Sequence, residues 1–383
     1  MATFSLQFLL GTHREPAECV IKVGAALEEI TDFYPFLTEV TVECTRDEAA
    51  VATLSLETRR DEQGQWLIQD AGVFTPWAPI RIEAAFGSTT EEVFRGYIRE
   101  VRAEYPEEPG AAVAVVECQD ESIRLDREQV RRAWGEETPT TDRAILSEIL
   151  SGRTGLSLHT DSADGQSNLV LNQNGTDIVF LRQRARANGY ELIFREGTAY
   201  FGPMRLDAER QATIMVYAGP DTNCLSFTSR ADGHQPDRVA FDVAPEEGEE
   251  VVTETVEPDL PLLGTTRADS SASGLDDFTW RLSREGGGSE EQLRQQAQRM
   301  ANEASMRVHA EGELDGSLYG HVLLVGLPVG VDGVGDWLGG TYYVDKVTHR
   351  FTTEGYRQSF ELLRNAYGDD LESGGLGALS GIL

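Results

Sequence analysis

The stretch GTYYVDKVTHRFTTEGYRQSFELLRN, residues 340–365, decides the fold of this chain. Two runs rich in β-branched and aromatic residues flank TTEG, where Gly355 permits a turn, so the stretch predicts an antiparallel hairpin. Side chains alternate between the two faces of a strand. This alternation assigns one face of the first strand to Tyr343, Asp345, Val347 and His349, the other to Tyr342, Val344, Lys346 and Thr348, and one face of the return strand to Tyr356, Gln358, Phe360 and Leu362.

The histidine and arginines of this hairpin do not predict a reaction centre. No Ser, Cys or ordered carboxylate near His349 completes a recognisable mechanism. We therefore expect His349 and Arg350 to end one strand, and Tyr356 to begin the strand that closes a small β-barrel.

Two further regions show the same sequence pattern typical of β-strands. Between residues 38 and 125, runs such as EVTVECT, VATLSLET and APIRIEAAFG alternate apolar and polar residues and are separated by turn signals. Short strands at this spacing are typical of a small antiparallel barrel or sandwich. Strand texture returns after residue 211 in QATIMVYAG, NCLSFTSR and DRVAFDV. The sequence therefore predicts two β-barrels in one chain.

Helices are predicted between and within the barrels. TPTTDRAILSEILSG and GTDIVFLRQRARANG combine capping residues with apolar residues at helical spacing, and Gly189 is expected to end the second helix. The predicted fold class is mainly β with an α+β insertion: two small antiparallel barrels plus a helix-and-hairpin domain. The predicted domains are a first barrel at 1–130, an α/β insertion at 131–210, a second barrel at 211–368 with an acidic loop at 244–288 and a helix at 289–307, and a flexible C-terminal tail at 369–383.

Composition argues against several functions. The formal net charge of −32 disfavours a duplex-binding surface, because phosphate contacts need clustered Lys and Arg. No stretch approaches the roughly 18 consecutive apolar residues of a membrane span, and no basic leader precedes the first apolar run. The cysteines lie far apart and without metal-binding spacing: Cys19, Cys44, Cys118 and Cys224. We expect a cytosolic protein without membrane insertion, specific nucleic acid binding, disulfides or metal.

No motif predicts catalysis or cofactor binding. The nearest approach to a nucleotide-binding loop is the run with Gly330, Gly333 and Gly335, but it lies between strands and no helix start follows it, so a turn is expected. The six histidines are scattered, and close pairs among the 65 acidic residues arise by chance. The expectation is a protein that is not an enzyme and needs no cofactor.

Three stretches resemble the phage late control D family, which is similar to the hub half of VgrG spike proteins. They are FRGYIREV at 94–101, DIVFLRQRARANGYELIFREGTAYFGP at 177–203 and the closing hairpin with its Tyr-x-Val-x-x-Val-x-His, Gly-Tyr and Arg-Asn elements. The resemblance covers roughly residues 36–365. The candidate structural or interface residues in these stretches are Phe94, Gly96, Gly189, Tyr190, Tyr343, His349, Arg350, Gly355 and Tyr356.

The resemblance implies a baseplate hub of a contractile injection machine, either a tailed phage or a phage-derived particle. It implies that the two barrels are related and that three copies form a ring of six barrels joining the tail tube to the spike. The implied partners are other copies of this chain, the spike protein, the first tail-tube ring or a tube initiator, and baseplate wedge proteins. Hub proteins of the VgrG type continue into a spike, whereas this chain ends soon after Asn365. The spike is therefore expected to be a separate protein. The chain would be cytoplasmic during assembly and then part of the particle.

Two other functions remain open at this point. A tail-associated cell-wall hydrolase would need a cleft with convergent acid and base groups. A glycan-binding adhesin would need clustered exposed aromatic residues, and the five tryptophans do not cluster in sequence: Trp66, Trp77, Trp134, Trp280 and Trp337.

Overall fold

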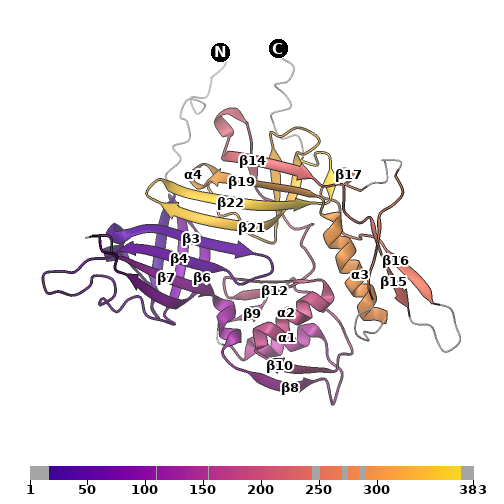
Figure 1. Cartoon of the computed structure of the whole chain (residues 1–383), viewed down its shortest axis with the longest axis horizontal. Coiled ribbons are helices and arrows are strands. Elements are labelled where there is room, and N and C mark those ends of the chain that lie inside the picture. Colours follow the sequence, from indigo (N-terminus) through magenta and orange to yellow (C-terminus); the bar gives the residue numbers. More distant parts are fainter. Residues whose placement is uncertain are drawn as a thin grey trace, which may run out of the picture.

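The fold is mainly β with a few helices, as the sequence predicts. A computed structural model describes residues 17–108, 110–153, 155–243, 251–269, 275–283 and 290–371. Within these residues, thirteen strands belong to one continuous sheet, and smaller sheets lie beside it (Figure 1).

Six strands form the first barrel, in the order β1-β5-β6-β7-β4-β3. Inward-facing apolar residues alternate with outward-facing ones because of the period of two; in β4, Ala52, Leu54 and Leu56 are fully buried. The strands are β1 Glu18–Val23, β3 Leu37–Thr45, β4 Val51–Glu57, β5 Pro79–Phe86, β6 Thr89–Glu104 and β7 Val113–Asp120, and the two-residue β2, Glu28–Glu29, extends the sheet beyond β1.

Six strands also form the second barrel, in the order β13-β20-β21-β22-β19-β14. A separate set of buried residues fills it, among them Ile214, Leu314 and Phe360. The strands are β13 Gln211–Met215, β14 Cys224–Ala231, β19 Val308–Asp315, β20 Pro328–Asp332, β21 Gly340–Thr352 and β22 Gly355–Arg364.

An α/β insertion lies between the barrels in sequence. The Thr141 hydroxyl accepts a hydrogen bond from the amide N–H of Ala144 and caps α1. Gly189 ends α2, as predicted, and does so in the left-handed conformation at φ +66°. Both helices pack on a shared core that includes Leu146, Leu181 and Phe201. The elements are β8 Val130–Trp134, α1 Asp142–Ser151, β9 Ser157–Leu158, β10 Leu171–Gly175, α2 Asp177–Asn188, β11 Glu191–Arg195 and β12 Thr198–Gly202.

A small side unit interrupts the second barrel between β14 and β19. Its helix α3, Glu290–Ser305, lies beside a three-stranded sheet (Figure 1). Leu293 and Ala297 of the helix pack against Phe241 of the sheet. The acidic stretch expected as a loop at 244–288 therefore contributes strands where it is described; residues 244–250, 270–274 and 284–289 lie outside the described part. The strands are β15 Arg238–Val243, β16 Val252–Val256 and β18 Thr279–Arg281.

Short elements complete the chain. They are β17 Thr266–Arg267, β23 Ala366–Tyr367, the one-turn α4 Gly316–Tyr319, and the 3₁₀ helices Thr31–Phe36, Glu121–Asp126 and Gly219–Asp221. Among the described residues, no helix has both the length and the apolar character needed to cross a membrane.

Candidate functional site

The predicted hairpin, β21 with β22, joins the two barrels. The first part of β21 pairs with β20, whereas residues 346–352 pair antiparallel with β3 of the first barrel. The other edge of β21 pairs with β22 along most of its length. A single strand therefore belongs to the second barrel and also extends the sheet of the first, which fixes the two barrels edge to edge.

A β-bulge at Asp345 corrects the predicted faces of this strand. The register shifts between Val344 and Lys346, so one extra residue stands in β21. Tyr342, Val344 and then Val347 all pack in the core of the second barrel. The prediction that Val347 shares a face with Tyr343 rather than with Val344 is wrong, because a one-residue bulge reverses the alternation beyond it. On β22 the predicted face is right: Tyr356, Gln358, Phe360 and Leu362 are all buried.

Arg46 connects three parts of the chain beside this bulge. Its Nε lies 2.5 Å from Asp345 Oδ1 in the second barrel, and its Nη1 lies 2.9 Å from Glu191 Oε1 in the insertion. The Tyr343 hydroxyl donates to the other oxygen of Glu191 at 2.7 Å. Burial disfavours the charge on Arg46, but Glu191 and Asp345 outweigh it and raise the pKa of Arg46. The group stays ionised and holds the insertion and both barrels in one arrangement.

His349 is a buried structural histidine. Its exposed fraction is 1%, and its Nδ1 lies 2.8 Å from the hydroxyl of Tyr356 across the hairpin. Burial lowers the pKa of His349 to about 3. The Tyr356 ring stacks on Phe351 with 4.1 Å between ring centroids. The imidazole is therefore neutral at physiological pH and packs within the junction.

A cavity of about 60 Å³ lies where the two barrels and the insertion meet. Phe94, Arg195, Leu324, His349 and Cys44 contribute to its lining. Burial raises the pKa of the Cys44 thiol to about 12, so this thiol is protonated and unreactive. The protonated Cys44 thiol is a poor nucleophile, and an imidazole with a pKa of about 3 is too weak a base to accept a proton efficiently at neutral pH. Over the described ranges, no group of three or more His, Cys, Asp or Glu side chains could hold a metal ion.

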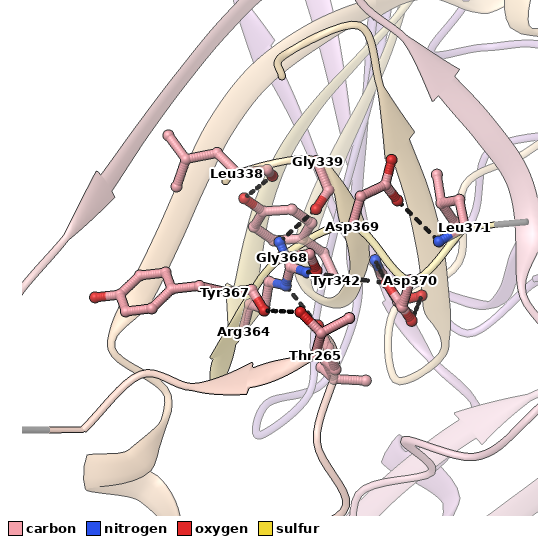
Figure 2. Close-up of polar contacts among 12 residues, drawn as sticks. Thr265, Leu338, Gly339, Tyr342, Arg364, Tyr367, Gly368, Asp369, Asp370 and Leu371 are labelled. Carbon is pink, nitrogen blue, oxygen red and sulfur yellow. Dashed lines mark hydrogen bonds and ion pairs between the residues drawn. The ribbon is translucent and has the colours of Figure 1, made fainter. Parts of the chain in front are cut away.

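Arg364, at the end of β22, is a second centre of polar contacts. Its side chain is fully buried and donates to three backbone carbonyls, those of Leu263, Gly339 and Gly368 (Figure 2). The guanidinium also lies 5.1 Å from the centroid of the Tyr342 ring. One side chain thus ties the loop before β17, the loop before β21 and the segment after β23 to the end of the second barrel.

The chain after Tyr367 continues this contact region. Asp370 accepts hydrogen bonds from the backbone N–H and the hydroxyl of Thr341, both at 2.7 Å (Figure 2). Trp337 is 59% exposed and stacks on Tyr367 at 5.2 Å between ring centroids. Of the predicted C-terminal tail, residues 369–371 are in contact with the barrel, and residues 372–383 lie outside the described part.

The predicted candidate residues fall into three places. Tyr343, His349, Arg350, Gly355 and Tyr356 lie in the junction hairpin, where Arg350 is exposed and forms an ion pair with Glu39 of β3. The Gly355 backbone has φ +120°, in the range that favours glycine, as its turn position predicts.

The remaining candidates lie apart from this hairpin. Phe94 and Gly96 are in β6, where a Cβ on Gly96 would lie 2.1 Å from the carbonyl oxygen of Gln119. Gly189 and Tyr190 are in the insertion, and the Tyr190 ring meets Phe201 edge-on.

The sequence interpretation did not identify five residues of these contact centres: Arg46, Glu191, Asp345, Arg364 and Asn365. One signal was available, because Arg364 has the same parity as the inward-facing residues of β22 and so falls on the barrel interior. Asn365 follows it, and its side chain binds Leu263 N–H and the carbonyl of Pro261. No local signal marks Arg46 or Glu191, which are 145 positions apart.

Comparisons with solved structures show the same fold in tail proteins and in a component of a secretion system. The chain is 13% identical to a 43 kDa tail protein of prophage MuSo2 from Shewanella oneidensis, with a TM-score of 0.67 over 91% of this chain and 98% of the other. It is 11% identical to a tail protein from Neisseria meningitidis, with a TM-score of 0.62 over 92% and 97%. An Escherichia coli protein described as a component of the type VI secretion system has 12% identity and a TM-score of 0.54 over 88% and 76%.

A family model gives a match in sequence. No curated protein matches the chain. The model described as the Alg8 N-terminal domain matches residues 17–353, which include the first barrel, the insertion, the side unit and the second barrel as far as the end of β21, but not β22. The chain therefore belongs to the Alg8 N-terminal domain family.

Proposed function

We propose that this chain is a structural baseplate hub protein of a contractile injection machine, in which three copies form a ring that joins the tail tube to a separate spike protein. The observation that carries the proposal is the pair of barrels with the same strand order, fixed edge to edge through β21 and β3. Three chains of two barrels each would supply six similar units for a closed ring.

Two independent likenesses support this role. The motifs at 94–101, 177–203 and 340–365 resemble late control D proteins, and solved structures with a similar fold include tail proteins and a component of the type VI secretion system. A Francisella PdpA–VgrG complex contains a chain with a TM-score of 0.53 at 8% identity, over 94% of this chain and 60% of the other. We propose the spike, the first tube ring and wedge proteins as partners, with assembly in the cytoplasm before incorporation into the particle.

The internal contacts suit a part that transmits load without catalysing a reaction. The Arg46 ion pairs and the Arg364 contacts join segments far apart in sequence. Glu191 and Arg364 are buried, and removing a partner from a buried charged group costs several kcal/mol, so these contacts favour fixed relative positions of the barrels. A ring that seats a tube on one side and a spike on the other requires this rigidity.

The oligomeric state tests the proposal. Light scattering coupled to size exclusion, at several salt concentrations and with the spike protein added, should give the mass of three chains, and electron microscopy of the same fractions should give a three-fold ring. A chain that stays monomeric both alone and with its spike would contradict the hub assignment.

A further inference from the structure

We infer that neighbouring copies join by strand pairing. The outer edge of β14 in one copy pairs antiparallel with residues 99–106 of the next copy, which are the last part of β6 and the two residues that follow it. This inference rests on the proposed ring, and it deepens the proposal by assigning the interface and its register. Within one chain, β21 of the second barrel pairs with β3 of the first, and this junction is the template for the junction between copies.

The two barrels are repeats of one strand arrangement. Reading outward in each, β5, β6, β7, β4 and β3 of the first barrel occupy the places of β20, β21, β22, β19 and β14 of the second. The meander of three strands, the fourth and fifth strands and their antiparallel pairings all correspond. One strand differs in direction, since β1 is antiparallel to β5 and β13 is parallel to β20.

Irregular features correspond residue by residue. Pro79 pairs with Tyr97 as Pro328 pairs with Tyr343. The next residue of each long strand donates alike: Ile98 N–H to the carbonyl of Ala78 at 3.0 Å, and Val344 N–H to the carbonyl of Leu327 at 3.1 Å.

The bulges match as well. A bulge follows directly in both long strands, at Arg99 in β6 and at Asp345 in β21. The register of β3 shifts between Leu37 and Glu39, and that of β14 shifts between Cys224 and Ser226. Bulges at the same places in both repeats give the equivalence single-residue precision.

The equivalence identifies two strand edges that have no partner strand among the described residues, although the equivalent edges in the other barrel are paired with each other. Beyond its bulge, β21 pairs with β3 on the side where β20 has ended. Beyond its own bulge, β6 has β7 on one side, and among the described residues no strand pairs with it on the side of β5. The strand equivalent to β3 is β14, and the sheet ends there with an eight-residue edge. The other end of the sheet is the two-residue β2, which is too short to pair extensively.

Transferring the register of β3 on β21 to β14 on β6 gives defined partners. Val347 opposite Cys44 becomes Val101 opposite Ala231, and Phe351 opposite Val40 becomes Tyr105 opposite Phe227. These residues stand on the inward face, where Tyr105 is 56% exposed in the single chain. An antiparallel pair here would cover that ring and satisfy backbone groups of both edges.

Charges on the outward face fit a diagonal pattern. The register places Arg230 opposite Arg102 and diagonal to Glu100. Within the chain, Arg350 of β21 forms its ion pair with Glu39 of β3 along the same diagonal. Arg230 and Glu100 are both exposed in the single chain. Diagonal neighbours in a sheet are within reach of long side chains, so this pair would fix the register between copies.

Cysteine cross-linking tests the register directly. The double variant V101C/A231C should form disulfides between copies under mild oxidation and give a covalent trimer on a non-reducing gel, because directly opposed residues in a sheet meet the disulfide geometry. The single variants V101C and A231C control for the four native cysteines. Trimers by light scattering without cross-links would overturn this interface and leave the hub proposal standing; monomers throughout would overturn the hub proposal itself.

A charge exchange gives a second, non-covalent readout. Glu100→Arg should raise the dissociation constant of the trimer at least tenfold, because it replaces the negative charge beside Arg102 and Arg230 with a third positive charge. Adding Arg230→Glu should recover most of the loss. Arg131→Glu, an exposed arginine on β8, is the matched control and should leave assembly unchanged. Equal weakening by Glu100→Arg and by the control, or no recovery in the double variant, would overturn the pairing.

Discussion

The two barrels have the same strand arrangement, but different side chains bond to the backbone of the first strand of each barrel. These side chains are called the sealing residues. In the first, the hydroxyl of Tyr34 accepts a hydrogen bond from Ile21 N–H of β1 at 2.9 Å, just before β3 begins. In the second, the side chain of Asn223, just before β14, accepts from Met215 N–H and donates to the carbonyl of Thr213 in β13. A polar residue before the equivalent strand closes each barrel, although neither its identity nor the direction of the first strand is shared.

The comparison shows that the two barrels share their strand order, whereas the side chains that bond to their first strands differ. An open barrel edge leaves backbone groups unpaired, so some group must satisfy them. An amide, with a donor and an acceptor, can bind two groups of one strand, whereas a phenol at the edge binds one here. The second barrel is the more elaborate of the two, because it also carries the Arg364 contacts and the side unit.

The largest expected effect comes from removing the feature that the first barrel lacks. Arg364→Leu would leave the carbonyls of Leu263, Gly339 and Gly368 without their donor at the end of the second barrel. The free energy of unfolding should fall by about 3–5 kcal/mol. Urea unfolding followed by tryptophan fluorescence measures it. Arg294→Leu, which removes an exposed ion pair on α3, should change the same quantity by less than about 1 kcal/mol. Equal effects of the two variants would contradict the role of Arg364.

The sealing residues should differ in importance. Asn223→Ala removes two hydrogen bonds of a buried side chain and leaves partly buried backbone groups of Thr213 and Met215 without this partner, so a loss of about 2–3 kcal/mol is expected. Tyr34→Phe removes the bond from Ile21 N–H and the bond that the hydroxyl donates to the exposed Glu29 carboxylate, and at this half-buried position it should cost about 1 kcal/mol. The same urea titration compares them, and the reverse order would show that the first barrel depends more on its seal.

The smallest effect on the free energy of unfolding at neutral pH should come from the protonation of His349, which lies at the junction of the two barrels. Its folded pKa of about 3 lies below the ordinary value of 6.5, so the unfolded chain binds a proton first as the pH falls. This group should have no effect above about pH 7, and it should destabilise the fold below pH 6.5 by up to about 1.4 kcal/mol per pH unit.

The matched variant isolates this contribution. His349→Gln cannot titrate, and its amide can still bond to Tyr356, so its unfolding free energy should change less than that of the wild type between pH 7 and pH 5. Identical pH slopes in the two proteins would show that His349 is not buried as a neutral group.

Some of the architecture was predictable from local sequence. Alternation in 340–365 predicts the hairpin, the inward side of β22 and, by parity, the buried position of Arg364. Glycine after an apolar helical stripe predicts the end of α2 at Gly189. The bulge at Asp345 was not predictable, because one inserted residue is decided by the neighbouring strands and leaves no mark in the alternation.

The sequence by itself determined which segments are strands and helices, because the period of apolar residues and the turn glycines act over a few neighbouring positions. Only the tertiary structure decided that β21 pairs with β3 some 300 positions away and that Arg46 meets Glu191 and Asp345. It also decided that, within the described part of the chain, the outer edge of β14 and the end of β6 beyond its bulge have no partner strand. Which strands pair depends on the relative stability of all possible edge pairings in the folded chain. A local stretch of sequence does not contain that information.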